Sequence, residues 1–274
     1  MLGFVLVLVM SLAAAAPIGV AQATPASERW ALLIGVDRFE GRTRPNYGAV
    51  NDVMLFRDAL VRSGWSDDHI KVLVDGGARA ADIRAGMRWL VERTNDQSLS
   101  AVHYSGHVKQ VGSTVSLWPH DNRFIPDTEV ASTLSQLRGK SWIDISGCEA
   151  AAFDKGLSAP NRLFTASSRG DEKSYEMVSA RKSIFSMLLV EQGMLEGRAD
   201  DNSDGRVSVQ EAFRFAAERA PELSRAGPNG PQHPQIAGGD GTEFFLDPPP
   251  PPAAPVDGCT GFRLLGIFCV PKLF

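Results

Sequence analysis

Short apolar runs alternate with amphipathic segments through the middle of the chain. The run 30–36 is apolar apart from one glycine, which is typical of a strand buried on both faces of a sheet. Similar runs predict further strands at 70–74, 100–104, 142–145, 162–166 and 242–246, with a hairpin arm at 114–118. Apolar residues at helical spacing predict helices at 51–62, 80–93, 128–137, 183–193 and 209–219. This alternation predicts an α/β fold, a mostly parallel six-stranded sheet with helices on both faces.

The N-terminal segment has a different pattern. No charged residue precedes Glu28, and residues 2–20 are almost wholly apolar. Ala21-Gln22-Ala23 fits a small-x-small cleavage site, so residues 1–23 are interpreted as a signal peptide of a secreted protein. The segment lacks the usual Lys or Arg at its start, and an uncleaved membrane anchor is the alternative. After removal of the signal, no stable membrane span is expected.

The C-terminal segment begins with a proline run. Residues 248–255 read as a stiff proline-rich linker, which ends a globular domain over 27–247. The tail 256–274 is short and apolar and carries Cys259 and Cys269. An oxidising compartment would allow these two to form a disulfide, leaving Cys148 alone. A lone thiol in an exported protein is either buried and inert or kept for chemistry.

Composition narrows the class of protein. The chain has 274 residues, of which 43% are apolar and 22% charged, which excludes a collagen-like, coiled-coil or mainly disordered protein. The net charge is −4 and no basic block is present, so a nucleic-acid partner is not expected. The expected partner is a protein or peptide substrate, and the expected state is a monomer.

Nucleophile chemistry follows two of the predicted strands. His107 comes shortly after the strand 100–104, and Cys148 comes shortly after the strand 142–145. If these strands are parallel neighbours, their ends lie side by side, and an imidazole beside a thiol can accept its proton. His107 and Cys148 therefore form a candidate catalytic dyad. Taken separately, Cys148 could be a buried core thiol and His107 a loop histidine bonded to a carbonyl, whereas His103 is expected to pack in the core.

Several segments together carry a family resemblance. Tyr104-Ser-Gly-His107 matches a catalytic histidine motif, and Ile143-Asp-Ile-Ser-Gly-Cys148 stands where a catalytic cysteine is found. The other matching segments are 30–36, 48–60, 117–121, 125–129, 165–168 and 184–186. In number and order they resemble the caspase-like cysteine peptidases, especially the bacterial metacaspase-like and orthocaspase-like members. The resemblance covers residues 30–246 and implies a caspase-like three-layer αβα sandwich.

The resemblance also implies a mechanism. Cys148 would attack the scissile carbonyl to form an acyl-enzyme, with His107 as general acid and then general base. The N–H groups of Cys148 and of the residue after the histidine, here Val108, would form the oxyanion hole. No metal or organic cofactor is implied at the dyad. The family has glycine where Val108 stands, and a positive φ there would be costly for valine.

The substrate pocket is the less constrained part of the resemblance. Asp52 matches the acidic residue that selects Arg or Lys at P1, the residue before the scissile bond, but it could instead cap a helix N-terminus. Ser146 stands where metacaspase-like members have an aspartate that lines this pocket. The preferred substrate is therefore a peptide with a basic P1. A rival interpretation uses Arg42 or Arg44 to bind an acidic or amide P1, and further subsite candidates are Asp171 and Glu172.

A second candidate site has the spacing of a calcium-binding loop. The twelve residues 200–211 follow an EF-hand pattern, with Gly205 at the sixth position where the chain must turn sharply. The expected Ca²⁺ ligands are Asp200, Asn202, Asp204, the carbonyl of Arg206, Ser208 and Glu211. A polar turn without a metal is the alternative.

Two classes of function remain open. The first is an exported, calcium-binding cysteine endopeptidase. It would act as a single chain, because only 149–160 separate Cys148 from the next element, and Lys155 is a possible self-cleavage point. The second is a catalytically inactive caspase-like module that binds peptides or protein partners. A flavodoxin-like binder of small molecules is less favoured, since no glycine-rich phosphate loop follows the first strand.

Overall fold

A computed structural model describes residues 28–248, 262–264 and 268–270 of the chain. Its centre is a six-stranded sheet with the strand order β11-β8-β7-β3-β1-β2. The strands are β1 (Arg29–Gly35), β2 (Ile70–Val74), β3 (Leu99–Ser105), β7 (Lys140–Ser146), β8 (Arg162–Ala166) and β11 (Gln235–Gly238). Neighbouring strands run parallel except β11, which is antiparallel to β8.

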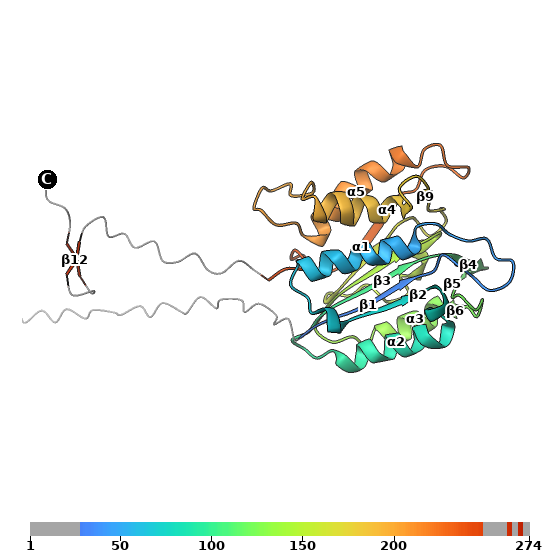
Figure 1. Cartoon of the computed structure of the whole chain (residues 1–274), viewed down its shortest axis with the longest axis horizontal. Coiled ribbons are helices and arrows are strands. Elements are labelled where there is room, and N and C mark those ends of the chain that lie inside the picture. The colour runs from blue at the N-terminus through green and yellow to red at the C-terminus, as the bar shows by residue number, and fades with distance from the viewer. Residues whose placement is uncertain (1–27, 249–261, 265–267, 271–274) are drawn as a thin grey trace, which may run out of the picture.

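Helices cover both faces of the sheet (Figure 1). On one face lie α1 (Ala49–Arg62), α4 (Ile184–Ser186), the π-helical η5 (Met187–Leu195) and α5 (Val209–Leu223). On the other face lie α2 (Ala80–Arg93) and α3 (Asp127–Leu134). Each face has its own hydrophobic cluster, and every residue of β3 is buried between the two. The predicted three-layer α/β sandwich is confirmed.

Two small antiparallel ribbons extend beyond the main sheet. The first consists of β4 (Val108–Val111), β5 (Thr114–Leu117) and β6 (Ile125–Pro126), and it follows β3 directly. The second pairs β9 (Glu176–Met177) with β10 (Lys182–Ser183) and precedes α4. Single short turns of helix connect other elements, namely η2 (Asp67–His69), η3 (Asp75–Gly77) and η4 (Ala150–Phe153).

The prediction of a last strand over 242–246 is wrong. The sixth strand is β11, whose sequence Gln-Ile-Ala-Gly has one large apolar residue and gives little pattern to recognise. Phe244 and Leu246 are buried, but their main chain forms other bonds: the N–H of Val209 donates to the Phe244 carbonyl, and the Trp65 indole donates to the Leu246 carbonyl. The apolar alternation in this segment therefore reflects its packing on the core, not pairing in a sheet.

Several sequence predictions concern the chain ends. The signal peptide at 1–23 and most of the linker lie outside the described residues, as does Cys259 of the proposed disulfide. In the tail, β12 (Phe262–Leu264) pairs antiparallel with β13 (Phe268–Val270). Within the part of the chain that the structure describes, no helix is both long and apolar enough to cross a bilayer.

Candidate active site

The carboxyl ends of β3 and β7 lie side by side at one edge of the sheet. Ser105, the last residue of β3, pairs with Ser146, the last residue of β7. The N–H of Gly106 then donates to the Ser146 carbonyl at 3.1 Å, so the alignment continues into the loops. His107 and Cys148 each stand two residues after these paired serines. The sheet thus places the two residues that the sequence proposes as a dyad in adjacent loops at one edge, and no hydrogen bond joins their side chains among the described contacts.

Gly147 lets the two loops pack directly against each other. A β-carbon at this position would lie 2.8 Å from the Gly106 carbonyl oxygen and 3.0 Å from a methyl carbon of Val108. Contact with a backbone oxygen at 2.8 Å cannot be relieved by a side-chain rotation. The side chain of Ser167 also bonds both the N–H and the carbonyl of Gly147. The loop before Cys148 is therefore held from both sides.

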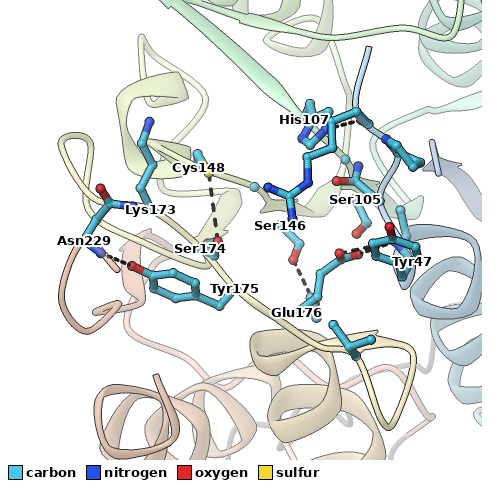
Figure 2. A pocket seen from close by; sticks show the side chains of 18 of the residues that line it. Tyr47, Ser105, His107, Ser146, Cys148, Lys173, Ser174, Tyr175, Glu176 and Asn229 are labelled. Carbon is cyan, nitrogen blue, oxygen red and sulfur yellow. Dashed lines mark hydrogen bonds between the residues drawn. The ribbon is translucent and has the colours of Figure 1, made fainter. Parts of the chain in front are cut away.

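His107 and Cys148 line one cleft of about 400 Å³ (Figure 2). Its polar lining includes Arg44, Ser105, Ser146, Lys173, Glu176 and Ser183. These residues come from the loop before α1, the ends of β3 and β7, and the segment that follows β8. The cleft therefore lies at the carboxyl edge of the parallel strands, where α/β folds bind ligands.

The imidazole of His107 is fixed by a carbonyl and by aromatic rings. Its Nε2 lies 2.8 Å from the carbonyl oxygen of Arg44. A carbonyl only accepts, so Nε2 carries the proton and Nδ1 is the ring's acceptor. The ring also stacks on Phe39 at a centroid distance of 5.0 Å and contacts Trp118. Burial lowers the pKa of His107 below its ordinary value, which favours the neutral base.

The thiol of Cys148 is half-buried in the cleft. Its Sγ lies 4.0 Å from the carbonyl oxygen of Ser174, which is its only hydrogen-bond partner among the described residues. Burial raises the pKa of the thiol above its ordinary value, and the Glu149 carboxylate adds to this effect. Cys148 is thus mainly a neutral thiol at pH 7, so a nearby base must remove its proton during attack.

Val108 occupies the start of β4 without the strain that its β-branch could cause. Its φ lies outside the left-handed region. The described non-glycine residues that do lie in that region are Asp75, Asn122, Glu149, Arg181 and Ser203. The N–H of Trp118 donates to the His107 carbonyl, and Val108 faces Leu117 in the next pair. Because hydrogen-bonded and open pairs alternate, the N–H of Val108 points away from β5. Its role in an oxyanion hole, with that of Cys148, stays a prediction.

Asp52 lies beneath the cleft and does not line it. The carboxylate is fully buried and accepts hydrogen bonds from the Ser105 hydroxyl at 2.8 Å and the Ser183 N–H at 3.1 Å. Burial raises its pKa to about 6, partly offset by His103 and by these hydrogen bonds. Asp52 therefore bonds two residues that line the cleft, Ser105 and Ser183, without reaching it itself. Ser146 does line the cleft, and its hydroxyl bonds that of Ser183 at 3.1 Å.

Glu176 is a cleft residue that sequence reasoning missed. It lies on β9, and its carboxylate accepts the N–H groups of Tyr47 and Gly48 just before α1, at 2.9 and 2.8 Å. It is the only acidic residue among those described as lining the cleft. No sequence motif marks it, because only the tertiary fold brings the β9–β10 ribbon against α1. Arg44 also lines the cleft, whereas Arg42 is exposed and does not.

The opposite wall of the cleft carries a charged pair. Lys173 lines the cleft and pairs with Glu149, the buried residue that follows Cys148. Glu149 has a positive φ of 49°, and its N–H donates to the Glu172 carbonyl. The pair neutralises both charges beside the thiol. The other two charged side chains of the cleft are Arg44 and Glu176. Neither takes part in an ion pair among the described residues.

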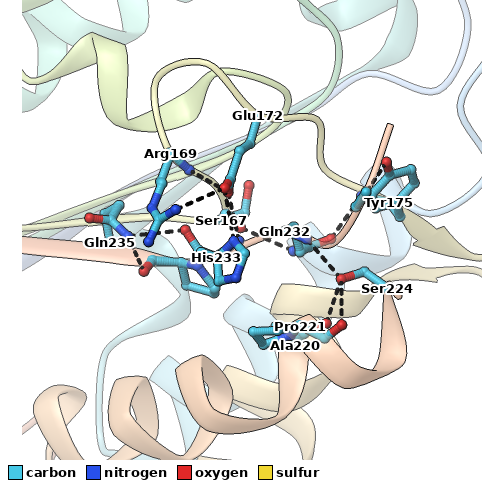
Figure 3. Close-up of polar contacts among 12 residues, drawn as sticks. Ser167, Arg169, Glu172, Tyr175, Ala220, Pro221, Ser224, Gln232, His233 and Gln235 are labelled. Atoms are coloured by element: carbon cyan, nitrogen blue, oxygen red, sulfur yellow. Dashed lines mark hydrogen bonds and ion pairs between the residues drawn. The ribbon is translucent and has the colours of Figure 1, made fainter. Parts of the chain in front are cut away.

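The segment that carries Lys173, Tyr175 and Glu176 is anchored by a buried glutamine (Figure 3). The side chain of Gln232 accepts the N–H of Tyr175 at 2.9 Å and donates to the Ser167 carbonyl at 3.0 Å. Next to it, His233 bonds both carboxylate oxygens of Glu172. Glu172, a subsite candidate from the sequence, thus has a structural role. Asp171 is exposed, and neither residue lines the cleft.

The predicted calcium loop lies elsewhere. Residues 200–211 connect η5 with α5, and none of them lines the cleft. No three His, Cys, Asp or Glu side chains anywhere in the described ranges form a preassembled metal-binding group.

Comparison with known proteins supports the assignment of a family. A family model described as the caspase domain matches residues 28–238. Metacaspase-1 of Mycosarcoma maydis is 36% identical over 93 residues, 32% of this chain and 23% of that protein. Metacaspase-1 of Eremothecium gossypii is 30% identical over 125 residues, 39% of this chain and 27% of that protein. The matched regions thus span about a quarter of each curated relative.

A solved structure is similar in fold. A protein of Geobacter sulfurreducens aligns over 77% of this chain and 94% of its own, with a TM-score of 0.59 and 12% identity. That likeness concerns the fold alone. The family model covers most of the chain, and the resemblance drawn from the sequence agrees with it. The chain therefore belongs to the caspase domain family, a family of cysteine-type peptidases.

Proposed function

We propose that this protein is an exported cysteine endopeptidase that cleaves peptides after a basic residue, using His107 and Cys148. The observation that carries the proposal is the shared cleft of a neutral thiol and an imidazole whose acceptor nitrogen is unoccupied in the described hydrogen bonds. The apolar segment 1–23 supports export, because it has the pattern of a secretory signal.

The reaction begins with attack of Cys148 on the scissile carbonyl. The thiol proton passes to Nδ1 of His107, while the bond from Nε2 to the Arg44 carbonyl holds the ring and stabilises the imidazolium that forms. The imidazolium then protonates the leaving amine, and the C–N bond breaks to give an acyl-enzyme. Neutral His107 next removes a proton from water, which attacks the thioester and releases the acid and the free thiol.

The oxyanion of each tetrahedral intermediate requires hydrogen-bond donors that are already in position. We propose the N–H groups of Cys148 and Val108 for this role, because Val108 faces away from β5 in an unstrained conformation. The packing of Gly147 against Gly106 keeps the two donor segments adjacent. No step of this scheme is routed through a metal ion.

Glu176 and the serines favour a basic P1 residue. A P1 arginine entering the cleft would meet the Glu176 carboxylate and the hydroxyls of Ser146 and Ser183, with Asp52 behind them. A guanidinium suits such a mixed set of acceptors because it presents several donors in a plane. Arg44 also lines the cleft, and its positive charge would instead favour the alternative substrate, a peptide with an acidic or amide P1 residue.

The test is peptide hydrolysis by the purified secreted protein. Fluorogenic peptides would carry Arg, Lys, citrulline, Asn or Asp at P1, and citrulline tests the charge because it keeps the shape of arginine. We expect cleavage of the Arg and Lys peptides and none by the Cys148→Ala or His107→Ala variants. Glu176→Gln should reduce kcat/KM for Arg peptides at least tenfold with little change for citrulline, while Asp171→Asn, on the same segment, should change neither.

The second candidate function is a peptide-binding module without catalysis. It would be supported if no peptide were cleaved while Cys148→Ala and the wild-type protein bound the same peptides equally well. Preference for Asp or Asn at P1 would overturn the basic preference and point to Arg44. Export has its own test: the N-terminus of protein recovered from the medium should lie close to residue 24.

A further inference from the structure

The loop 200–211 presents oxygen atoms at the spacing used for calcium. It connects η5 with α5 and has no part in the peptidase cleft. Gly205, at its sixth position, has a φ of 82°, which suits glycine. Oxygen donors stand at the positions expected of calcium ligands: Asp200, Asn202, Asp204, the carbonyl of Arg206, Ser208 and Glu211.

The loop is already folded around its own acidic side chains. The two carboxylate oxygens of Asp200 accept the N–H groups of Asp204 and Gly205 at 3.1 and 3.0 Å. The side-chain oxygen of Asn202 also accepts the N–H of Asp204, at 2.8 Å. These bonds hold the first ligands in a tight turn, so binding a cation would need little rearrangement of the main chain.

Glu211 supplies an independent sign of a missing ligand. This residue is only 2% exposed, and one of its carboxylate oxygens accepts the N–H and the hydroxyl of Ser208, completing a capping box at the start of α5. The other oxygen, Oε1, is buried and has no hydrogen-bond donor among the described residues, while the carboxyl of Asp201 lies beside this carboxylate. Leaving a buried carboxylate oxygen unpaired is costly, and such atoms normally have a partner. Because Ser208 belongs to the loop, this carboxylate faces the loop.

The basic side chains near the loop are engaged elsewhere. Arg214 pairs with Asp201, which is not one of the proposed ligands. The guanidinium of Arg206 is directed to Asp247 and to the ring of Phe245. No ion pair among the described residues neutralises Asp200 or Asp204. Glu211 lies beside Asp201 and within electrostatic reach of the Arg214 that pairs with it.

We propose that residues 200–211 bind one Ca²⁺ ion, with Glu211 directing its unpaired oxygen to the metal. A mixture of carboxylates, an amide, a hydroxyl and a backbone carbonyl gives more donors than Mg²⁺ readily accepts, so the site should select Ca²⁺. Since the three carboxylates do not form a preassembled group, the ion must draw them together. Binding would then fix η5 against α5, the two helices that the loop joins.

The experiment is calorimetric titration of the secreted protein, first stripped with EDTA, with CaCl₂ and with MgCl₂. We expect one Ca²⁺ per chain, a Kd on the order of 10⁻⁴–10⁻³ M as in extracellular sites of this type, and at least tenfold weaker Mg²⁺ binding. At 10 mM Ca²⁺ the Tm should rise by about 3–10 °C, because the ligand binds only the folded state.

The variant Glu211→Gln isolates the metal-binding role, because glutamine can still complete the capping box. It should weaken Ca²⁺ binding at least tenfold while keeping the Tm measured in EDTA near that of wild type. Asp200→Asn, in the exposed loop, provides a second test that does not touch the core, and Glu218→Gln, exposed on the same helix, should bind normally. Absence of Ca²⁺ binding up to 10 mM, or equal binding by wild type and both ligand variants, would overturn the proposal.

Discussion

The N–H of Gly106 donates a hydrogen bond to the carbonyl oxygen of Ser146 across 3.1 Å. This bond extends the pairing of β3 with β7 by one step beyond the sheet, just before His107 and Cys148. The relative position of the imidazole and the thiol is therefore set by the register of two buried strands. Changes that separate these loops should impair catalysis more than they impair folding.

The first prediction concerns the contact at Gly147. In Gly147→Ala the new methyl group would lie 2.8 Å from the Gly106 carbonyl oxygen, so one of the two loops must move. A displacement of about 1 Å in a catalytic group costs roughly 10²-fold in rate. We expect kcat/KM to fall about a hundredfold, measured on the best fluorogenic peptide. As a control, Gly76→Ala adds a methyl group where nothing lies within 4 Å and should keep full activity.

The second prediction concerns the pH dependence of kcat/KM. Burial lowers the pKa of His107 below 6.5 and raises that of Cys148 above 9.0. Below the pKa of His107 the ring is protonated and cannot accept the thiol proton, so activity falls as the pH decreases. Above the pKa of Cys148 the proton that the leaving amine needs is lost, so kcat/KM falls again. The profile should therefore be a broad plateau between these two limbs. An acidic limb centred above pH 6.5 would contradict the inferred neutral dyad.

The acidic limb has a specific control. Asp52 also titrates near pH 6 and lies beneath the cleft, so its ionisation could contribute to the profile. Asp52→Asn removes this group, and the acidic limb should remain where it is. A limb that disappears in this variant would assign the effect to Asp52 and not to His107.

The sequence predicted the dyad because its signals are local. A buried strand followed by Ser-Gly-His, and another followed by Ser-Gly-Cys, can be recognised without knowing the fold. Parallel pairing of these neighbours in the sheet then requires that both loops emerge at one edge. The bond between Nε2 and the Arg44 carbonyl could not be predicted, since it depends on the path of an irregular loop sixty-three residues earlier.

The charged groups that line the cleft were harder to predict from the sequence than the dyad. Asp52 matched a family motif, yet its side chain turns into the core and bonds Ser105 and Ser183. Glu176, which does line the cleft, lies on a two-residue strand with no recognisable pattern. Similarly, β11 has too few apolar residues to be identified, whereas the buried Phe244 and Leu246 gave 242–246 the apolar alternation that is typical of a strand. Burial and long-range packing decided each of these cases.

The third prediction concerns the stability cost of a charge on Asp52. Its folded-state pKa of about 6 lies above the ordinary value of 3.8, mainly because the carboxyl is buried. Below pH 4 the carboxyl is protonated in both the folded and the unfolded chain. As the pH rises from 4 to 6 the unfolded chain ionises first, so the folded state loses stability until its own buried carboxyl is charged. Between pH 4 and 7.5 this amounts to a loss on the order of 3 kcal/mol.

Urea unfolding at several pH values measures this effect. The unfolding free energy of wild type should fall relative to that of Asp52→Asn as the pH rises from 4 to 7.5, because asparagine cannot ionise. Comparing the two proteins cancels the contributions of all other titrating groups. A constant difference between them over this range would show that Asp52 is already charged at pH 4.

His103 and Asp144 form a buried pair behind the cleft. Nδ1 of His103 lies 2.8 Å from the Asp144 carboxylate, and neither side chain is exposed. The imidazole stacks on Phe56 at a centroid distance of 3.7 Å, and the Thr165 hydroxyl donates to the other carboxylate oxygen. This arrangement agrees with the expectation that His103 packs in the core. The pair stands on β3 and β7, directly opposite each other in the register that positions the dyad.

The fourth prediction is that these two residues contribute as a unit. His103→Leu leaves a buried carboxylate with one remaining partner, and Asp144→Leu leaves a buried imidazole with none, so each change should reduce the unfolding free energy by about 3–5 kcal/mol. The double variant removes both ionisable groups and should lose clearly less than the sum of the single losses, because neither an unpaired carboxylate nor an unpaired imidazole remains and only the Thr165 hydroxyl loses its acceptor. Urea unfolding of the four proteins at pH 7 gives the coupling energy directly. Additive losses would show that His103 and Asp144 are stabilised independently, by Phe56 and Thr165, and not by each other.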